Sequence, residues 1–462
     1  MPLESRKASR MRKKEQLVIS KSVAECLRKQ LPAGETLSVR VICTSDHPVD
    51  SLTPQRKYGH FSATSTLSRR VLILVSQNSC LVSGIEAHEF VTTAVDVSCS
   101  LNNSSTYSQQ EIDKGPPAAA PAATVTVNTS ILKVDTTGEL TTRMPLARTL
   151  VAGYLHSLQR FSCVGGVTNI GVHLFARAQP EYLFAQSKKS SGKHILSDMA
   201  LIKWWQGTMH LGLGYAVSAG QSQDDQSADP SCAASIPAHI VIPGSTQSEA
   251  SLPLLSSSVS NTDNNGLPAE SGAASGSSVK WVWGSPYPKN DLACNCVLQF
   301  PDDPITRLLS ERHGAFWSVS MLFEMLAISE ECGSGHRTAY ISASIPVASL
   351  SPLPSDLPEQ SVDTADEGAL SFDAYDDILV ALFDHEMDFS DREKSASSTA
   401  RLDAYLDSKH SIPVVTVTTS GPPISQKSTG TSLGNNPSGS AAAAPKVNDL
   451  TMAVRKKRKV EM

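Results

Sequence analysis

Hydrophobic positions in the first hundred residues change from a helical to a strand-like spacing. Residues 18–31 carry apolar side chains at helical intervals, and short apolar runs bounded by polar residues follow. This pattern predicts one helix and then three strands, at 37–43, 71–75 and 90–97. Every apolar run is far shorter than the ~18 residues that a membrane-spanning helix requires, so we expect no membrane segment.

The middle of the chain alternates between strand and helix patterns. We predict a strand, a helix, a second strand and a second helix, over 130–134, 146–158, 170–176 and up to Trp205. Pro145 suits the first turn of the first helix, and Thr142 is expected to cap it.

The last third of the chain is predicted to contain shorter elements. In VKWVWG, Trp281 and Trp283 share one face of a predicted strand. Two further strands are predicted at 295–300 and 338–345, and three helices at 304–312, 316–328 and 365–392. The last of these helices is acidic and amphipathic.

Two long polar stretches interrupt the ordered sequence. Residues 101–127 and 220–278 are rich in Ser, Gly, Asn, Pro and Ala, and we expect them to be unstructured insertions. The hydrophobic fraction of 40% and the aromatic fraction of 5% are both low, as expected for a folded part diluted by polar segments. We therefore expect one substantial α/β domain over 16–400, followed by an unstructured tail over 401–462.

Positive charge is concentrated at the two ends of the chain. The formal net charge is −5, so the molecule as a whole is not built to bind a polyanion, and we expect no sequence-specific DNA binding. Residues 1–15 are rich in Lys and Arg and are expected to form a flexible arm. RKKRKV at 455–460 is typical of nuclear import signals, although a merely solvated tail has a similar composition. We expect a nuclear protein.

Nine cysteines are scattered without the spacing of a disulfide framework or a zinc site. Cys294 and Cys296 form a CxC that suits a strand with alternating faces, and Cys332 lies four residues before His336. Because these pieces are far apart in the sequence, we expect reduced thiols and no metal.

The first candidate for chemistry is LKVDTTG at 132–138. A strand that ends in Asp135 and turns at Gly138 leads into a helix N-terminus, where unpaired N–H groups favour anions. Arg143 would add a guanidinium for a diphosphate. An ordinary strand–turn–helix with a capping threonine and a surface arginine explains the same residues.

The second candidate is the segment from Arg177 and Tyr182 to a pair of tryptophans. Neighbouring side chains on a helix point about 100° apart, so Trp204 and Trp205 cannot face the same core position. One of them would line a cleft, and two packed tryptophans at a domain seam are the alternative.

The third candidate is the carboxylate pair of FPDDP at 300–304. Asp303 precedes a proline and is expected to cap a helix whose buried stripe begins at Ile305. Capping does not explain Asp302, and adjacent carboxylates repel each other unless a cation or a proton intervenes. An anion site, an aromatic wall and a carboxylate pair fit several enzymes.

Together these segments resemble the signature of the fungal histone acetyltransferases first named as regulators of yeast retrotransposition. Their pattern is Phe-x-Arg-x-x-x-x-Tyr-Leu-Phe, a lysine-rich loop, Lys-His-(Ile/Val)-Leu and Lys-Trp-Trp, which runs here over 175–205. LKVDTTG, FPDDP and EECGSGHR (330–337) resemble further blocks in family order, and the likeness spans roughly 66–400.

The resemblance implies a fold, a co-substrate and a site. The fold is α/β (α+β), the mixed central sheet surrounded by helices of the CREB-binding-protein acetyltransferases, and the co-substrate is acetyl-coenzyme A. The implied catalytic residues are Asp303, Asp302, Asp135 and Trp205, the last at the lysine entrance. The implied acetyl-coenzyme A contacts are Val134, Asp135, Thr136, Arg143, Met144, Pro145, Phe175, Arg177, Tyr182, His194, Ile195, Leu196, Trp204 and Trp205.

The resemblance also implies substrates and partners. The substrates are core and tail lysines of newly made histone three, presented as the dimer of histones three and four. The partners are histone chaperones of the anti-silencing-function and nucleosome-assembly-protein types, acting in chromatin assembly and genome stability. Two positions depart from the family: Gln179 replaces a small residue, and Ile305 replaces a lysine that becomes acetylated.

Two other functions compete with this one. A chromatin scaffold with a degenerate acetyltransferase fold would dock histones without catalysis, and a different coenzyme A transferase would act on a small amine. The basic tail argues against the small-amine enzyme. The intact residues that argue against the scaffold are Asp135, Arg177, Trp205 and Asp303.

Overall fold

The computed structural model of the chain describes residues 3–52, 61–96, 123–218, 235–255, 279–311, 313–329, 336–347, 350 and 370–422. The chain divides into two units, Met1–Pro423 and Ile424–Met462, and all described residues belong to the first. The import cluster at 455–460, most of the two expected insertions and Cys332 therefore lie outside the described residues.

A mixed ten-stranded sheet runs through the first unit in the order β10-β1-β3-β4-β5-β6-β9-β7-β8, with β2 paired to β3. The β5–β6 and β7–β8 pairs are parallel and the other pairs are antiparallel. The strands are β1 (Thr36–Cys43), β2 (His47–Val49), β3 (Phe61–Gln77), β4 (Cys80–Asp96), β5 (Ala123–Thr136), β6 (Val167–Arg177), β7 (Ile236–Val241), β8 (Val279–Trp283), β9 (Thr338–Pro346) and β10 (Val414–Thr418).

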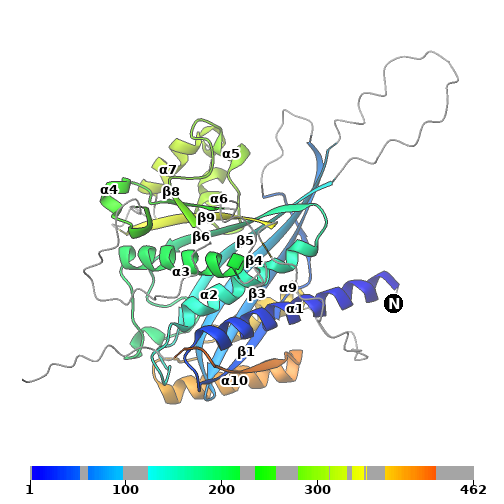
Figure 1. The fold of residues 1–462 in the computed structure, drawn as a ribbon, viewed down its shortest axis with the longest axis vertical. Coiled ribbons are helices and arrows are strands. Elements are labelled where there is room, and N and C mark those ends of the chain that lie inside the picture. The colour runs from blue at the N-terminus through cyan, green and yellow to red at the C-terminus, as the bar shows by residue number, and fades with distance from the viewer. Residues whose placement is uncertain are drawn as a thin grey trace, which may run out of the picture. The chain divides into compact units, whose positions relative to one another are not determined.

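Helices cover both faces of this sheet (Figure 1). α1, α2 and α3 lie side by side on one face and share its main apolar core, whereas α9 and α10 pack over β3 and β4 on the other face. The short helices α5 to α7 pack on that second face over β9. The helices are α1 (Leu3–Gln30), α2 (Leu146–Ser157), α3 (Asp198–Ser218), α4 (Gln247–Ala250), α5 (Ala293–Cys296), α6 (Pro304–Ser310), α7 (Val319–Ile328), α9 (Phe372–Leu382) and α10 (Arg392–His410).

Side chains that alternate along the central strands pack against the helices on both faces of the sheet. On β9, Ile341 is fully buried in the main core while its neighbour Tyr340 faces the α5–α7 layer. The expected mixed sheet surrounded by helices is confirmed. The parallel β5–β6 pair requires a crossover, which α2 provides, and it brings the carboxyl ends of β5 and β6 to one edge of the sheet.

Two predicted segments have a different structure. The second expected insertion contains β7, which pairs with β9 on one side and β8 on the other, so tertiary pairing gives this short strand its place. The expected strand at 295–300 is wrong, because 293–296 forms the helical turn α5. Its backbone is satisfied locally, with Val297 N–H donating to Ala293 C=O and Ala293 N–H to Trp317 C=O.

Four predicted boundaries are corrected. The expected flexible arm is helical from Leu3, in keeping with the helix propensity of Lys, Arg and Glu. α3 continues past Trp205 to Ser218. The expected helix at 365–392 is the shorter α9, which a turn separates from α10. The expected tail at 401 begins too early, since α10 and β10 continue to Thr418 and β10 pairs with β1.

Candidate active site

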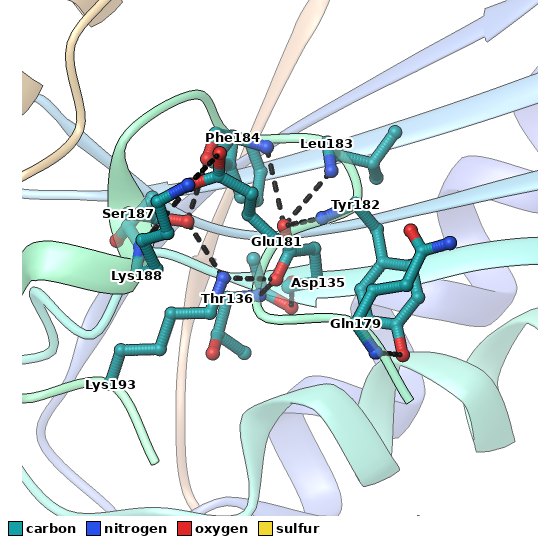
Figure 2. A network of polar contacts seen from close by, with 12 residues as sticks. Asp135, Thr136, Gln179, Glu181, Tyr182, Leu183, Phe184, Ser187, Lys188 and Lys193 are labelled. Atoms are coloured by element: carbon teal, nitrogen blue, oxygen red, sulfur yellow. Dashed lines mark hydrogen bonds and ion pairs between the residues drawn. The ribbon is translucent and has the colours of Figure 1, made fainter. Parts of the chain in front are cut away.

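Asp135 organises the carboxyl end of β5 (Figure 2). It is 5% exposed, and its Oδ2 accepts hydrogen bonds from three consecutive backbone N–H groups beyond β6, at 2.8, 2.9 and 3.2 Å. These donors belong to Tyr182, Leu183 and Phe184. Its Oδ1 accepts from Thr136 N–H at 2.8 Å and from Lys193 Nζ at 2.6 Å. One carboxylate thereby fixes a loop that follows the neighbouring strand.

Lys193 completes this anchor as a buried ion pair. Its side chain is 6% exposed, and Nζ also donates to Ser187 Oγ at 2.7 Å. The same loop touches the turn after β5, where Gly138 adopts φ +89° and faces Gly192. A Cβ on Gly138 would stand 2.4 Å from Lys193 N, so this close approach requires glycine. The turn of the LKVDTTG segment and the lysine-rich loop form one rigid corner.

A cavity of about 150 Å³ opens beside this corner, between the end of β5, the first turn of α2 and the start of α3. α2 begins without a side-chain cap, because its N-cap is Pro145. The expected cap Thr142 instead donates its hydroxyl proton to Glu35. The cavity is lined by Val134, Asp135, Thr136, Ala147, Gln179, Pro180, Tyr182, Lys193, His194, Ile195, Leu196, Leu201 and Trp204.

Tyr182 forms one wall of the cavity as a neutral phenol. Burial raises its pKa to about 12, and the Asp135 charge adds to the shift. The hydroxyl donates to Arg177 C=O at 2.6 Å and accepts from Gln179 N–H at 2.9 Å. Tyr182 therefore braces the turn that follows β6, and its ring is left to contact a ligand.

The two adjacent tryptophans divide their roles, as their 100° separation on a helix predicts. Trp204 lines the cavity, whereas Trp205 is 7% exposed and packs in the main core. Their rings meet edge to face at 4.9 Å. Trp205 thus supports the wall that Trp204 and the 47% exposed Ile195 present to a ligand.

Asp303 caps α6, as predicted, and its Oδ1 accepts the Ile305 N–H at 2.9 Å. Burial raises the pKa of its carboxyl to about 6, although that hydrogen bond and Arg307 act in the opposite direction. Asp302 is exposed and has a left-handed backbone with φ +59°, a conformation that aspartate tolerates better than most residues. Ile305 is fully buried, which confirms the predicted apolar stripe.

The predicted site residues therefore fall into two groups. Eight of the residues predicted from the sequence line the cavity, namely Val134, Asp135, Thr136, Tyr182, His194, Ile195, Leu196 and Trp204. The others stand outside its lining: Arg143, Met144, Pro145, Phe175, Arg177, Trp205, Asp302 and Asp303. β6 connects the two groups, because Phe175 packs against the α6 cluster while the chain after Arg177 forms the cavity wall.

Sequence reasoning missed several cavity residues. Ala147 and Leu201 belong to helix faces that also pack into the core, so no local pattern distinguishes them. Lys193 immediately precedes His194 in the lysine-rich motif, and that position was the available signal. Gln179, noted as a departure from the family, also lines the cavity.

Within the described ranges, no group of three or more His, Cys, Asp or Glu side chains could hold a metal ion. No helix in the same part of the chain is long and apolar enough to cross a membrane.

A mixed sheet wrapped by helices thus carries a cavity at the carboxyl ends of its parallel strands β5 and β6. Residues 23–405 match the histone acetyltransferase KAT11-type domain family. This match covers most of the chain, so the chain belongs to that family, and the resemblance recognised in the sequence is confirmed.

Individual relatives agree with the family. A curated Aspergillus flavus protein described as histone acetyltransferase rtt109 is 27% identical over 245 residues, which are 46% of this chain and 41% of that protein. A Schizosaccharomyces pombe protein of the same description is 26% identical over 180 residues, 38% of this chain and 42% of that protein. The aligned part thus spans less than half the length of these relatives.

A solved structure shares the fold. The crystal structure of Rtt109 from Aspergillus fumigatus matches with a TM-score of 0.57 at 20% identity, over 87% of this chain and 99% of that chain. The likeness covers nearly the whole of the solved chain.

Proposed function

We propose that this chain is a protein-lysine acetyltransferase that transfers the acetyl group of acetyl-coenzyme A to histone lysines. The observation that carries the proposal is the Asp303 carboxyl at the start of α6, whose pKa burial raises to about 6, in a chain of this family. A carboxyl with that pKa is a stronger base than an ordinary aspartate and is still ionised at neutral pH.

The chemical task is to remove a proton from a lysine ammonium. With a pKa near 10.4, only about one lysine in a thousand is neutral at pH 7.4, which costs about 4 kcal/mol. At the same pH the Asp303 carboxylate outnumbers its acid form by roughly 25 to 1. Its raised pKa makes proton transfer from lysine less unfavourable, by up to about 3 kcal/mol, than transfer to an aspartate with a pKa of 3.8.

The transfer then proceeds in one displacement. Asp303 takes one ammonium proton, directly or through a water, and the neutral nitrogen attacks the thioester carbonyl carbon. The new C–N bond forms, the C–S bond breaks, and the thiolate of coenzyme A leaves. The second proton on nitrogen goes to the thiolate or to solvent. Holding the two reactants side by side supplies much of the acceleration.

The cavity at the end of β5 suits the coenzyme. Its lining combines the Tyr182 and Trp204 rings and exposed Ile195, which fit an aliphatic arm, with polar His194 and the start of α2. The free N–H groups of a helix N-terminus favour a phosphate there. Arg143, Met144 and Pro145 directly precede α2 and would extend this contact outside the cavity.

Substrate and partners follow from family resemblance. The substrate is newly made histone three in its dimer with histone four, delivered by chaperones of the anti-silencing-function type, with a nucleosome-assembly-protein type as a further partner. The RKKRKV cluster at 455–460 supports a nuclear location.

Asp303→Asn tests the proposal. Asparagine caps a helix nearly as well as aspartate, so the fold and acetyl-coenzyme A affinity should persist while turnover falls by about a hundredfold or more. The variant should be at least as stable as the wild type above pH 6. Because folding raises the pKa of this carboxyl from 3.8 to about 6, the wild type loses stability as pH rises through that interval.

Asp302→Asn is the matched control. Asparagine also tolerates φ +59°, and the neighbouring side chain is exposed, so this variant should lose much less activity. Near-normal turnover in Asp303→Asn would reduce Asp303 to a helix cap. Wild-type protein that binds no acetyl-coenzyme A in calorimetry would support the scaffold function instead.

A further inference from the structure

A buried row of hydrogen-bonded side chains lies beneath the turn that carries Asp302 and Asp303. Tyr287 Oη lies 3.5 Å from Tyr340 Oη, and Tyr340 Oη lies 3.1 Å from His173 Nδ1. His173 Nε2 is 3.2 Å from Asn128 Oδ1. His173 and Tyr340 are 6% and 2% exposed, so they exchange these hydrogen bonds with each other and not with bulk water.

The hydrogen bonds in this row have one direction. Asn128 Oδ1 can only accept, so His173 carries its proton on Nε2, and Nδ1 is left as an acceptor. Burial lowers the pKa of His173 to about 3, which keeps the ring neutral. Tyr340 must then donate to Nδ1, and its oxygen receives the Tyr287 proton. Both phenol protons are thereby committed to the row.

The row contacts the aspartate turn on both sides of Asp302 and Asp303. On the N-terminal side of the turn, the Phe300 ring packs 5.2 Å from the His173 ring, and Leu298 N–H donates to Tyr287 Oη at 3.4 Å. On the C-terminal side of the turn, fully buried Ile305 shares an apolar cluster with Tyr340 and Tyr287.

Asp303 lies between these two contacts, and its N–H donates to Phe300 C=O at 3.3 Å. The groups that interact electrostatically with Asp303 are the Ile305 N–H and Arg307 on α6, Tyr287 in the segment ahead of α5, and Tyr340 on β9. Burial, with the Asp303 charge as a further cause, raises the pKa of both phenols, so they remain protonated.

We propose that Tyr287, Tyr340 and His173 are positioning residues that hold the Asp303 carboxylate in place and keep phenol protons directed away from it. The inference rests on the proposed role of Asp303 as the base. A carboxylate that accepts an additional hydrogen bond, from a phenol or from a water, becomes a weaker base. A row that donates no such hydrogen bond and excludes water therefore preserves the basicity of Asp303. The His173–Asn128 hydrogen bond also requires glycine at position 171, because a Cβ there would stand 2.7 Å from His173 Nε2 and 2.3 Å from Asn128 Oδ1.

Tyr287→Phe is the first test, measured as the pH dependence of kcat/KM with acetyl-coenzyme A and a histone substrate. The change removes the acceptor of Leu298 N–H, which frees that donor beside the aspartate turn, and it removes a phenol oxygen that interacts electrostatically with the Asp303 carboxylate. Both effects favour the ionised carboxyl. The acid limb of the kcat/KM profile should therefore move from about pH 6 to lower pH by about one unit or more. The weaker base should lower kcat roughly three- to tenfold, with little change in the KM for acetyl-coenzyme A.

Two further variants bracket this result. Asn128→Ala breaks the other end of the row by releasing the His173 tautomer, and it should shift the limb in the same direction. Tyr375→Phe removes the same atom from a fully buried tyrosine on α9, whose hydroxyl has no hydrogen-bond partner among the described residues. This control should leave both the limb and kcat unchanged, and thermal unfolding establishes that each variant is folded.

Carbon-13 NMR of the Asp303 carboxyl, assigned by comparison with Asp303→Asn, separates this inference from the proposed function. Suppose that the titrated pKa of the Asp303 carboxyl falls in Tyr287→Phe while Asp303→Asn turns over normally. This result would support the positioning role of Tyr287 and refute the catalytic role of Asp303. The inference is overturned if Asp303→Asn is inactive but Tyr287→Phe and Asn128→Ala leave the limb and the titration at their wild-type positions.

Discussion

Asp135 and Asp303 are both prominent aspartates of the sequence motifs, and their surroundings give them different roles. The Asp135 carboxylate receives five donors, four backbone N–H groups and one ammonium. Asp303 receives one backbone N–H in an apolar setting that raises its pKa to about 6. The first arrangement favours an anchor over the catalytic role that the family resemblance implied for Asp135, and the second favours a base.

Asp135→Asn should damage the fold of the corner more than any catalytic step. The amide would place its NH2 against Lys193 Nζ or against backbone N–H groups, and it leaves a buried ammonium without a counter-charge. Breaking a buried pair from one side costs about 3–5 kcal/mol, so urea unfolding should show a loss of that order together with weaker acetyl-coenzyme A binding.

Lys193→Met is the matched partner. It removes the ammonium but leaves Asp135 with its four backbone donors, so it should cost clearly less. If Asp135→Asn keeps full stability and cofactor affinity but loses turnover, Asp135 is catalytic after all.

The residues of the site could be predicted from motifs, but their contacts could not. Lys193 lies 58 positions from Asp135, and the residues joined by the His173–Tyr340 bond are 167 positions apart. Neither separation leaves a local pattern, and Tyr287 and Tyr340 belong to no motif that was recognised. Local rules did succeed where the chemistry is local, as in the Asp303 cap and the buried Ile305 two residues later.

At the scale of elements, hydrophobic periodicity predicted those strands and helices whose pattern is strong. β1, β3, β5 and β6 contain their predicted strands, β4 contains 90–96 of the strand predicted at 90–97, and the helix predicted at 146–158 corresponds to α2, which ends at Ser157. The failures are elements that depend on their neighbours. β7 is short and starts with Ile-Pro, and β10 has only five residues, so each needs a partner strand. α10 is polar along most of its length, and only a few buried residues such as Leu402 and Leu406 attach it to the core.

A pair of truncations tests the corrected boundary of the folded part. The fragment 1–422 keeps every described element and should unfold within about 2 °C of the full chain. The fragment 1–405 loses Leu406, which is fully buried, and the Asp407 partner of Arg40 at 2.8 Å. It also loses β10 and thereby exposes β1 as an edge strand. Circular dichroism should show no cooperative transition for 1–405, and a normal transition would mean that β10 is dispensable.

At the scale of the whole molecule, the family domain and the basic cluster are separate parts of the chain. The family match ends at residue 405, and the described structure ends at 422, whereas RKKRKV lies at 455–460. Catalysis and localisation should therefore respond to different changes. The residues proposed for acetyl transfer all lie within the family domain.

Deleting residues 454–462 should leave acetylation of purified histones unchanged while moving the protein from nucleus to cytoplasm. Five consecutive cations form the kind of short basic peptide that import receptors bind, and the deletion removes them together with no part of the described fold. Deleting 430–438, an equally long segment without charged residues, is the control and should leave the protein nuclear. Fluorescence microscopy of tagged proteins measures the distribution, and a parallel acetylation assay measures activity. Strictly nuclear fluorescence after deletion of 454–462 would assign import to the basic residues at the start of α1 or to a bound partner.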